Sequence, residues 1–485
     1  MSKKYSFESY ADAAAAVERI CEIYEDMTER IRRRFQRYLE GQRAGASVKD
    51  ACYPELRMSV GHHALVYDSR PSWGTLPYPG RYAATLTQPA LFRDYYRAQL
   101  GRLADYHGVP FEVGVSNRPI PLPFVVEEAT ADLQPEDIRA LQAVFAMPEL
   151  AAIEDAIANG TFRPAAGQPR PLSLFTAERV DFAIQRLHHY TGTHARHFQR
   201  FVLFTNYQRY VDAFIAHGRD IIAKSGGEDA YQSFVEPGDV VSDVGSGNRN
   251  LDARHPSQQM PAYHLTRRDR LGITLVNIGV GPSNAKTITD HLAVLRPHCW
   301  LMIGHCGGLR RSQQLGDYVL AHAYQREDHV LDHDLPVSVP VPPIAEIQVA
   351  LQDAVSRITG LGGQDLKSRM RTGTVVTTDD RNWELRSNEL YSQFNRSRAI
   401  AIDMESATIA ANGFRLRVPY GTLLCVSDKP IHGEIKLRGM ADSFYRQRID
   451  QHLTIGLETI RILRDRGVNQ LHSRKLRAFD EPPFQ

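Results

Sequence analysis

Carboxylate side chains directly follow apolar, strand-like segments at two places in the second half of the chain. Asp428 ends the segment GTLLCVSD (421–428), and Asp403 and Glu405 lie at and just beyond the end of AIAID (399–403). A buried carboxyl group has a raised pKa and can act as a general acid near neutral pH, whereas an ionised one can stabilise a developing positive charge. The pattern therefore indicates acid–base chemistry in which the carboxylates have different roles.

The same carboxylates also have purely structural interpretations. Asp428 can be a turn or helix-capping residue before Lys429 and Pro430, and Asp403 and Glu405 can cap the backbone amides of the helix that follows them. These residues alone leave both interpretations open.

Strand-like and helix-like segments alternate from residue 200 onward and would position these side chains. Such alternation predicts a largely parallel sheet with its chemistry at the carboxyl ends of the strands. The strand-like segments are 201–205, 272–281, 300–308, 317–324, 372–378, 399–403 and 421–428, and helices are expected at 206–218, 283–297, 405–414 and 440–467. The expected strand ends are Thr205, Gly279, Gly304, Thr377, Asp403 and Ser427. We expect GHCGG (304–308) to form a tight turn.

The first part of the chain has a different pattern. Residues 11–41 have apolar positions at helical spacing, residues 51–126 form short β-prone stretches broken by turn formers, and residues 134–159 are helical again. TFRPAAGQPRPLSLFT (161–176) has the composition of a linker. We therefore predict an N-terminal α+β domain over 1–175 and a catalytic α/β domain over 185–485.

The composition excludes several classes of protein. The chain has 485 residues, 42% hydrophobic residues and a net charge of +2, so nothing indicates bulk attraction to nucleic acid or to a membrane surface. No apolar run approaches the roughly 20 residues that a membrane span needs, and the N-terminus has no signal-peptide core. Five scattered cysteines predict a reducing compartment, and we expect a cytoplasmic protein.

Two motifs suggest other functions that we do not expect. VVSDVGSGN (240–248) could form the strand and Gly-rich turn of a dinucleotide site, but a Pro-containing segment follows it, so we expect a loop. His188, His189, His194 and His197 are close in sequence, but neither an HExxH motif nor a cysteine pair accompanies them. We therefore predict no metal site and no cofactor.

Three motifs together resemble one known superfamily. IGHCGGLR (303–310), DMESATIAANG (403–413) and CVSDKPIHGE (425–434) resemble, in order and spacing, the purine nucleoside phosphorylase and 5′-methylthioadenosine nucleosidase superfamily over residues 195–465. A long N-terminal extension is typical of one family within it, the AMP nucleosidases. The resemblance implies a nucleoside-phosphorylase-like mixed sheet flanked by helices, and hydrolysis of AMP to adenine and ribose 5-phosphate.

The resemblance also assigns roles to the carboxylates. Cleaving a purine N-glycosidic bond requires a better leaving group and stabilisation of an oxocarbenium-like sugar. Asp428 matches the family's general acid, which protonates purine N7, and Glu405 matches the glutamate that binds the ribose diol. Met404 would pack beneath the sugar. Asp403 stands where many relatives have glutamate, so its contact with the substrate is left open.

The remaining substrate-binding candidates follow from the same resemblance. Arg209 matches the residue that holds orthophosphate in phosphorylases, and it could instead bind the 5′-phosphate of AMP or be an exposed helix residue. Trp383 lies near the position of the aromatic residue that stacks on the base, with a core position as the alternative. Cys306, Gly307 and Ser427 belong to the matching motifs, and we expect Cys306 to be a small packing residue and not a nucleophile.

The nucleophile is indicated by a departure from the phosphorylase pattern. Phosphorylases of this group carry an arginine two residues before the GxCG turn, where this chain has Met302, and His305 occupies the second position of the turn. Loss of one guanidinium weakens phosphate binding, because it removes a pair of charge-assisted hydrogen bonds. We therefore expect water as the nucleophile and orthophosphate as an inhibitor.

Other functions remain as alternatives. A purine nucleoside phosphorylase or a methylthioadenosine nucleosidase would have similar motifs without an N-terminal domain of this size, and a non-enzymatic nucleotide sensor would not need the acid. Arg81, Arg93 and Arg97, interspersed with tyrosines, suit phosphate contacts or a subunit surface. By resemblance we expect ATP as an activator and a homohexamer.

Overall fold

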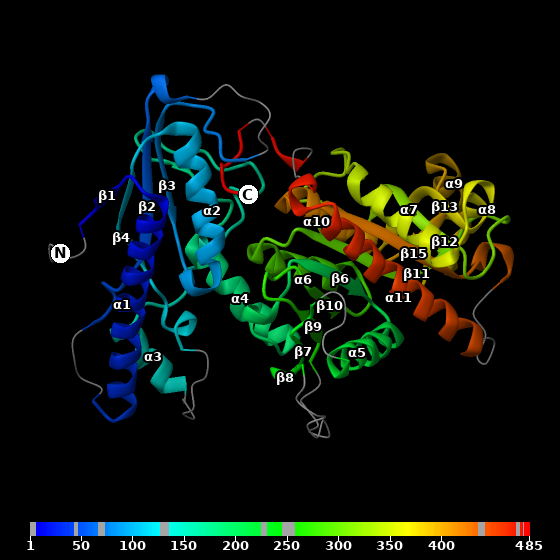
Figure 1. The fold of residues 1–485 in the computed structure, drawn as a ribbon, viewed down its shortest axis with the longest axis horizontal. Coiled ribbons are helices and arrows are strands. Elements are labelled where there is room, and N and C mark those ends of the chain that lie inside the picture. The colour runs from blue at the N-terminus through cyan, green and yellow to red at the C-terminus, as the bar shows by residue number, and fades with distance from the viewer. Residues whose placement is uncertain are drawn as a thin grey trace. The chain divides into compact units, whose positions relative to one another are not determined.

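The computed structural model describes residues 6–42, 47–65, 73–126, 135–224, 230–244, 258–434, 442–471, 476–478 and 480–485. The chain forms two compact units, Met1–Gln185 with Arg477–Gln485, and Arg186–Leu476 (Figure 1). The division falls inside helix α4 (Ala177–Thr191). The expected linker is packed within the first unit: Arg170–Pro171 form strand β5, and Leu172 is fully buried. The linker prediction was therefore wrong, because prolines also suit a sheet edge, where an amide donor is not needed.

The first unit contains a five-stranded sheet in the order β1-β4-β2-β3-β5, which is antiparallel except between β3 and β5. Its strands are β1 (Glu8–Tyr10), β2 (Cys52–Val60), β3 (Gly80–Thr85), β4 (Phe111–Pro119) and β5 (Arg170–Pro171), and its helices are α1 (Ala13–Leu39), α2 (Pro89–His107) and α3 (Pro135–Val144). The predicted α+β character of the N-terminal part is confirmed.

Helix α1 forms where the apolar spacing predicts it. Asp12 caps its start by accepting a hydrogen bond from the Ala15 amide at 2.8 Å. The buried side chains recur at helical spacing and pack against β2, β4 and α2. They include Val17, Ile20, Tyr24, Met27, Ile31 and Phe35.

Helix α2 was not predicted, because residues 51–126 were expected to contain only β-prone stretches. Its Pro89, which we interpreted as a turn former, occupies the first turn of the helix, where proline is favoured. Phe92, Tyr96 and Leu100 then give a buried face at helical spacing.

The second unit contains a ten-stranded mixed sheet in the order β14-β13-β12-β15-β11-β6-β10-β9-β7-β8. Strands β10, β6, β11 and β15 run parallel, as do β12, β13 and β14, whereas β12 is antiparallel to β15. The strands are β6 (Phe201–Thr205), β7 (Ser233–Glu236), β8 (Val240–Asp243), β9 (Ala262–Thr266), β10 (Ile273–Asn277), β11 (Cys299–Gly308), β12 (Tyr318–Glu327), β13 (Met370–Thr378), β14 (Ala401–Asp403) and β15 (Tyr420–Asp428). All seven predicted strand segments are confirmed, and the sheet is less parallel than expected.

Strands β7, β8 and β9 form an antiparallel extension of this sheet that we did not predict. Residues 240–243 of the Gly-rich motif form β8, so the expected loop is a strand here. Its glycines, Gly245 and Gly247, lie outside the described residues.

Helices cover both faces of the large sheet. Successive side chains of β11 point to opposite faces, so apolar side chains on each face need a helix to pack against. Leu301 and Ile303 lie on the side of α7 and α11, whereas Trp300 lies on the side of α10. Helix α11 packs against α5 and α7, and α6 packs against α10. The helices are α5 (Gln208–Ala223), α6 (Pro282–Leu292), α7 (Ala345–Thr359), α8 (Gly363–Arg369), α9 (Ser387–Ser397), α10 (Ser406–Leu416) and α11 (Asp442–Asp465) (Figure 1). Over the described residues, no helix is both long and apolar enough to cross a bilayer.

Candidate active site

A pocket of about 170 Å³ lies at the carboxyl ends of strands β6, β10, β11, β14 and β15 in the second unit. This is the edge of the sheet at which the sequence predicts chemistry. Most of the predicted site residues line the pocket: Cys306, Gly307, Trp383, Asp403, Met404, Glu405 and Ser427.

The pocket exists because β14 pairs with two strands. It runs parallel to β13 and antiparallel to β11, with Gly307 opposite Ile402 and Gly308 opposite Ala401. This second pairing brings the GHCGG motif beside the segment that carries Asp403. The expected tight turn at this motif was wrong: β11 continues to Gly308, with a bulge between Cys306 and Gly307. A bulge bends a strand without ending its pairing.

Glu405 is fully buried at the start of α10, and both of its carboxylate oxygens accept hydrogen bonds from other elements. Oε1 accepts from the Gly281 amide at 2.7 Å, and Oε2 accepts from Nδ2 of Asn206 at 2.8 Å. Burial raises the pKa of Glu405 above its ordinary range, and the negative charge of Asp403 raises it further. The two donors hold the carboxylate in place, and Glu405 also lines the pocket.

Asp403 has a different orientation. Its Oδ2 accepts hydrogen bonds from the Ser406 amide at 3.0 Å and from the Ser406 hydroxyl, and its Oδ1 accepts one from the Thr377 hydroxyl at 2.6 Å. Burial raises its pKa as well. Asp403 therefore has the capping role that the sequence left open for both carboxylates, whereas the Glu405 side chain makes no capping hydrogen bond to α10.

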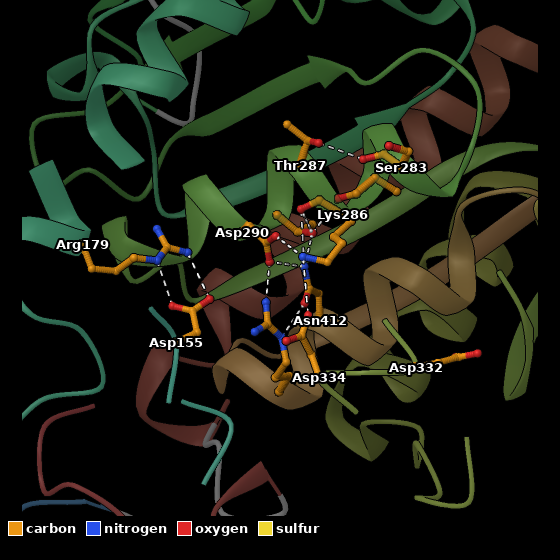
Figure 2. A network of polar contacts seen from close by, with 12 residues as sticks. Asp155, Arg179, Ser283, Lys286, Thr287, Asp290, Asp332, Asp334 and Asn412 are labelled. Atoms are coloured by element: carbon orange, nitrogen blue, oxygen red, sulfur yellow. Dashed lines mark hydrogen bonds and ion pairs between the residues drawn. The ribbon is translucent and has the colours of Figure 1, made fainter. Parts of the chain in front are cut away.

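A buried polar network holds together the two helices that converge on Glu405. Figure 2 shows Asp290 of α6 between Lys286 and Asn412: Lys286 Nζ lies 2.7 Å from Oδ2, and Asn412 Nδ2 donates to Oδ1 at 2.8 Å. Arg415 of α10 pairs with the same carboxylate. Burial opposes the charge of Asp290, but Arg415 and Lys286 outweigh it and keep the pKa of this carboxyl below its ordinary value. Helix α6 follows Gly281 and helix α10 follows Glu405. This network therefore maintains the distance between the Gly281 amide and the Glu405 carboxylate.

Trp383 has the core position that the sequence analysis gave as one alternative, and it also lies at the pocket. It packs edge-on against Phe394, with ring centroids 5.8 Å apart, in a cluster with Leu309, Val376 and Ile402, and it also lines the pocket. Its indole is therefore a rigid wall held by the core.

Cys306 and Ser427 form another wall. Cys306 is buried, and burial raises the pKa of its thiol well above the ordinary value. A thiol that stays protonated is a poor nucleophile, so the packing role is favoured. The Ser427 hydroxyl is directed to the Cys306 carbonyl at 3.4 Å and to Oδ1 of Asp428 at 2.8 Å.

Two predicted residues are not among those that line the pocket. Asp428 is the last residue of β15, paired in register with Gly307 and directly next to the lining Ser427. Arg209 is partly exposed in the first turn of α5. Asp428 thus directly follows one lining residue, Ser427, and Arg209 lies three positions after another, Asn206.

The sequence analysis missed three lining residues with polar side chains. Asn206 directly follows β6, His305 lies on β11 within 5.6 Å of the Tyr207 and Tyr210 rings, and Arg381 follows β13. The sequence pattern could have identified Asn206, because a polar residue directly after a buried strand lies at the edge of the sheet where ligands bind. Arg381 is exposed and gives this set a positive charge.

Two family models match separate parts of the chain, and one relative matches nearly its whole length. A model described as "Bacterial AMP nucleoside phosphorylase N-terminus" matches residues 15–169, and "Phosphorylase superfamily" matches 255–454. The AMP nucleosidase of Escherichia coli (strain K12) is 48% identical over 486 aligned positions, which cover 97% of this chain and 98% of that protein.

More distant relatives match only part of the chain. A guanosine phosphorylase of Halorubrum lacusprofundi is 25% identical over 214 positions, which cover 42% of this chain and 85% of that protein. The crystal structure of an AMP nucleosidase from Bacteroides thetaiotaomicron VPI-5482 has 27% identity and a TM-score of 0.42, and the match covers 59% of this chain and 98% of that one.

Proposed function

We propose that this chain, which belongs to the AMP nucleosidase family, hydrolyses the N-glycosidic bond of AMP to give adenine and ribose 5-phosphate. The observation that carries the proposal is the buried Glu405 carboxylate, held by Asn206 and Gly281 at the wall of the strand-end pocket. A buried anion at such a place suits a reaction whose transition state gains positive charge.

Glu405 is the proposed partner of the sugar. An ionised carboxylate can accept hydrogen bonds from both ribose hydroxyls, and its charge favours the oxocarbenium-like transition state. Met404, beside it in the lining, supplies an apolar surface beneath the ring. Asp403 acts indirectly, because its hydrogen bonds to Ser406 and Thr377 orient the start of α10.

Asp428 is the proposed general acid for purine N7. It is the last residue of β15 and directly follows the lining Ser427, and this position supports a role close to a bound base. The Ser427 hydroxyl donates to Oδ1 and thereby orients the carboxyl group. The rigid indole of Trp383 is the proposed stacking surface for the adenine.

Arg381 and Arg209 are the candidates for binding the 5′-phosphate. Arg381 lines the pocket and carries a permanent charge, which favours it for a dianion. Arg209 lies outside the lining residues, so we assign it the weaker contribution, including the binding of inhibitory orthophosphate.

Water is the proposed nucleophile. Met302, at the position where phosphorylases have arginine, is fully buried in β11 and offers no charge to an attacking phosphate. We expect ribose 5-phosphate as the sugar product and slower turnover in high phosphate.

The reaction products test this proposal. Purified enzyme should release adenine from AMP far faster than from adenosine, without any need for phosphate. Formation of ribose 1,5-bisphosphate in proportion to added phosphate would instead establish a phosphorylase. The Met302→Arg variant provides a matched test, because a restored guanidinium should tighten phosphate inhibition.

The first unit is the proposed regulatory domain, and ATP is the proposed activator. Its sheet carries a pocket of about 740 Å³ lined by Arg57, Arg81 and Arg118, which suits an anionic ligand. Arg93 and Arg97, for which the sequence left phosphate contacts and a subunit surface open, lie near Glu18 at 3.6 and 2.7 Å. Arg81 thus becomes the favoured member of that trio.

We also propose a homohexamer in the cytoplasm. Related enzymes complete their sites across subunit contacts, and all five cysteines of this chain are free and buried, as suits a reducing compartment. Light scattering coupled to size-exclusion chromatography tests the oligomeric state directly.

A further inference from the structure

A cluster of metal-ligand side chains lies in the second unit, among residues for which the proposed reaction has no role. His188, His194 and Asp239 each offer one ligand atom, and these atoms lie within 4.8 Å of one another. They come from the last turn of α4, the segment before β6, and the turn between β7 and β8. All three residues are partly buried.

Two hydrogen bonds donated by backbone amides join the two loops of this cluster. The His194 amide donates to Oδ1 of Asp239 at 2.9 Å, and the Gly238 amide donates to the Gly192 carbonyl at 2.7 Å. Asp239 has a φ of 55°, a conformation that non-glycine residues rarely adopt. Both carboxylate oxygens of Asp239 contact His194 in this conformation.

The side chains suit a cation. The rings of His188 and His194 stack with centroids 4.1 Å apart, and Nδ1 of His194 contacts Oδ2 of Asp239. His197 Nε2 and Arg196 also face Asp239, at 3.4 and 3.8 Å, and they make a simple ion-pair cluster the alternative.

We propose that His188, His194 and Asp239 bind a divalent transition metal ion with the ligand preferences of Zn²⁺. Zn²⁺ takes imidazole nitrogen and carboxylate oxygen at about 2.0–2.2 Å, usually with tetrahedral geometry. Ligand atoms around one such ion are about 3.5 Å apart, so modest side-chain rotations convert the cluster into a site. Mg²⁺ prefers oxygen ligands and is disfavoured by two imidazoles. The ion would cross-link the end of α4 to the β7–β8 turn, and water would complete its coordination.

Metal content measured on tag-free protein tests this site separately from AMP hydrolysis. After chelator treatment and incubation with Zn²⁺, wild-type protein should retain one Zn²⁺ per chain by mass spectrometry and should melt about 2 °C or more higher than the metal-free form. Mg²⁺ should have no such effect. His194→Ala and Asp239→Asn should weaken Zn²⁺ binding at least tenfold, because each variant removes one ligand of the ion.

His189→Ala is the matched control, since His189 is an exposed histidine on the same helix. It should bind Zn²⁺ as wild type does. Should a variant fail to fold, Co²⁺ titration of wild-type protein decides the matter, because a tetrahedral site gives an intense visible spectrum. Absence of this spectrum and of retained Zn²⁺ in the wild type, or equal Zn²⁺ affinity in folded Asp239→Asn, would overturn the proposal in favour of an ion-pair cluster.

Discussion

The second unit holds two carboxylates in a pocket of about 170 Å³, whereas the first unit has a pocket of about 740 Å³ over an exposed sheet. In the smaller pocket, Glu405 is fully buried and Asp403 nearly so, and burial raises both pKa values. In the larger pocket, the charged residues lie near the surface beside local partners. Arg57 bonds Glu55 at 2.9 Å and stacks over Phe7 at 3.6 Å.

The difference shows that size and reactivity are separate properties of a pocket. Exposed charges are screened by water and salt, so the larger pocket is suited to recognition of a ligand. A desolvated carboxylate interacts much more strongly with a charge that appears beside it. The smaller pocket is therefore the one in which chemistry is expected, and the following predictions test this distinction.

The largest effect is expected for Asp428→Asn, directly after Ser427 of the smaller pocket. An amide cannot deliver a proton to N7, and general-acid help is worth about 10²–10⁴-fold in rate. Turnover of AMP should fall by this factor while nucleotide binding, measured by calorimetry, persists. Near-normal turnover would remove Asp428 from the mechanism.

Glu405→Gln should lower kcat by about 10²–10³-fold, because it removes the anion that opposes the developing positive charge. The substrate 2′-deoxy-AMP provides the complementary test, since it lacks one hydroxyl of the diol. Wild-type enzyme should process it much more slowly than AMP. Equal rates for the two substrates would mean that Glu405 does not bind the diol.

The raised pKa of Glu405 should appear in the pH dependence of activity. If the ionised form is required, the rate should fall about tenfold per pH unit on the acid side, starting above the ordinary glutamate pKa of about 4.3. Stability should change in the opposite direction: a folded pKa above the unfolded one favours folding at low pH, and this contribution is lost as pH rises through the folded pKa. Urea unfolding of Glu405→Gln beside wild type should show a smaller pH dependence in the variant.

Asp403→Asn should have a modest effect, because the Asp403 side chain caps α10 and bonds Ser406 and Thr377. We expect the free energy of unfolding to fall by about 0.5–2 kcal/mol, as for loss of a helix cap. The loss of kcat should be smaller than that of Glu405→Gln. A larger loss would mean that Asp403 contacts the substrate itself.

The smallest effect on chemistry is expected in the larger pocket. Arg118→Ala should reduce stimulation by ATP, measured as the ratio of rates with and without ATP. Arg97→Ala is the matched control, because Arg97 pairs with Glu18 and does not line that pocket. A similar loss of stimulation in both variants would argue against the larger pocket as the effector site.

The sequence by itself determined seven strand segments of the second unit, the helices α5, α6, α10 and α11, and most of the residues at the strand ends. The apolar runs that became β6, β10, β11 and β15 have the short, buried pattern of central strands, and such periodicity is local and readable. Asp403, Ser427 and Asp428 were expected at strand ends for the same reason, whereas the roles of Met404 and Glu405 came from the superfamily resemblance. Local patterns were less informative for α2, where a proline at the first turn looked like a turn former.

Only the tertiary structure decided how these residues are used. Asp403 and Glu405 are two positions apart, yet one caps a helix and the other accepts hydrogen bonds from Asn206 and Gly281. The pairing of β14 with β11 and the gathering of His188, His194 and Asp239 likewise join segments distant in sequence. Periodicity reports which side of an element is buried, but the partner across the contact is set by long-range packing, which no local pattern encodes.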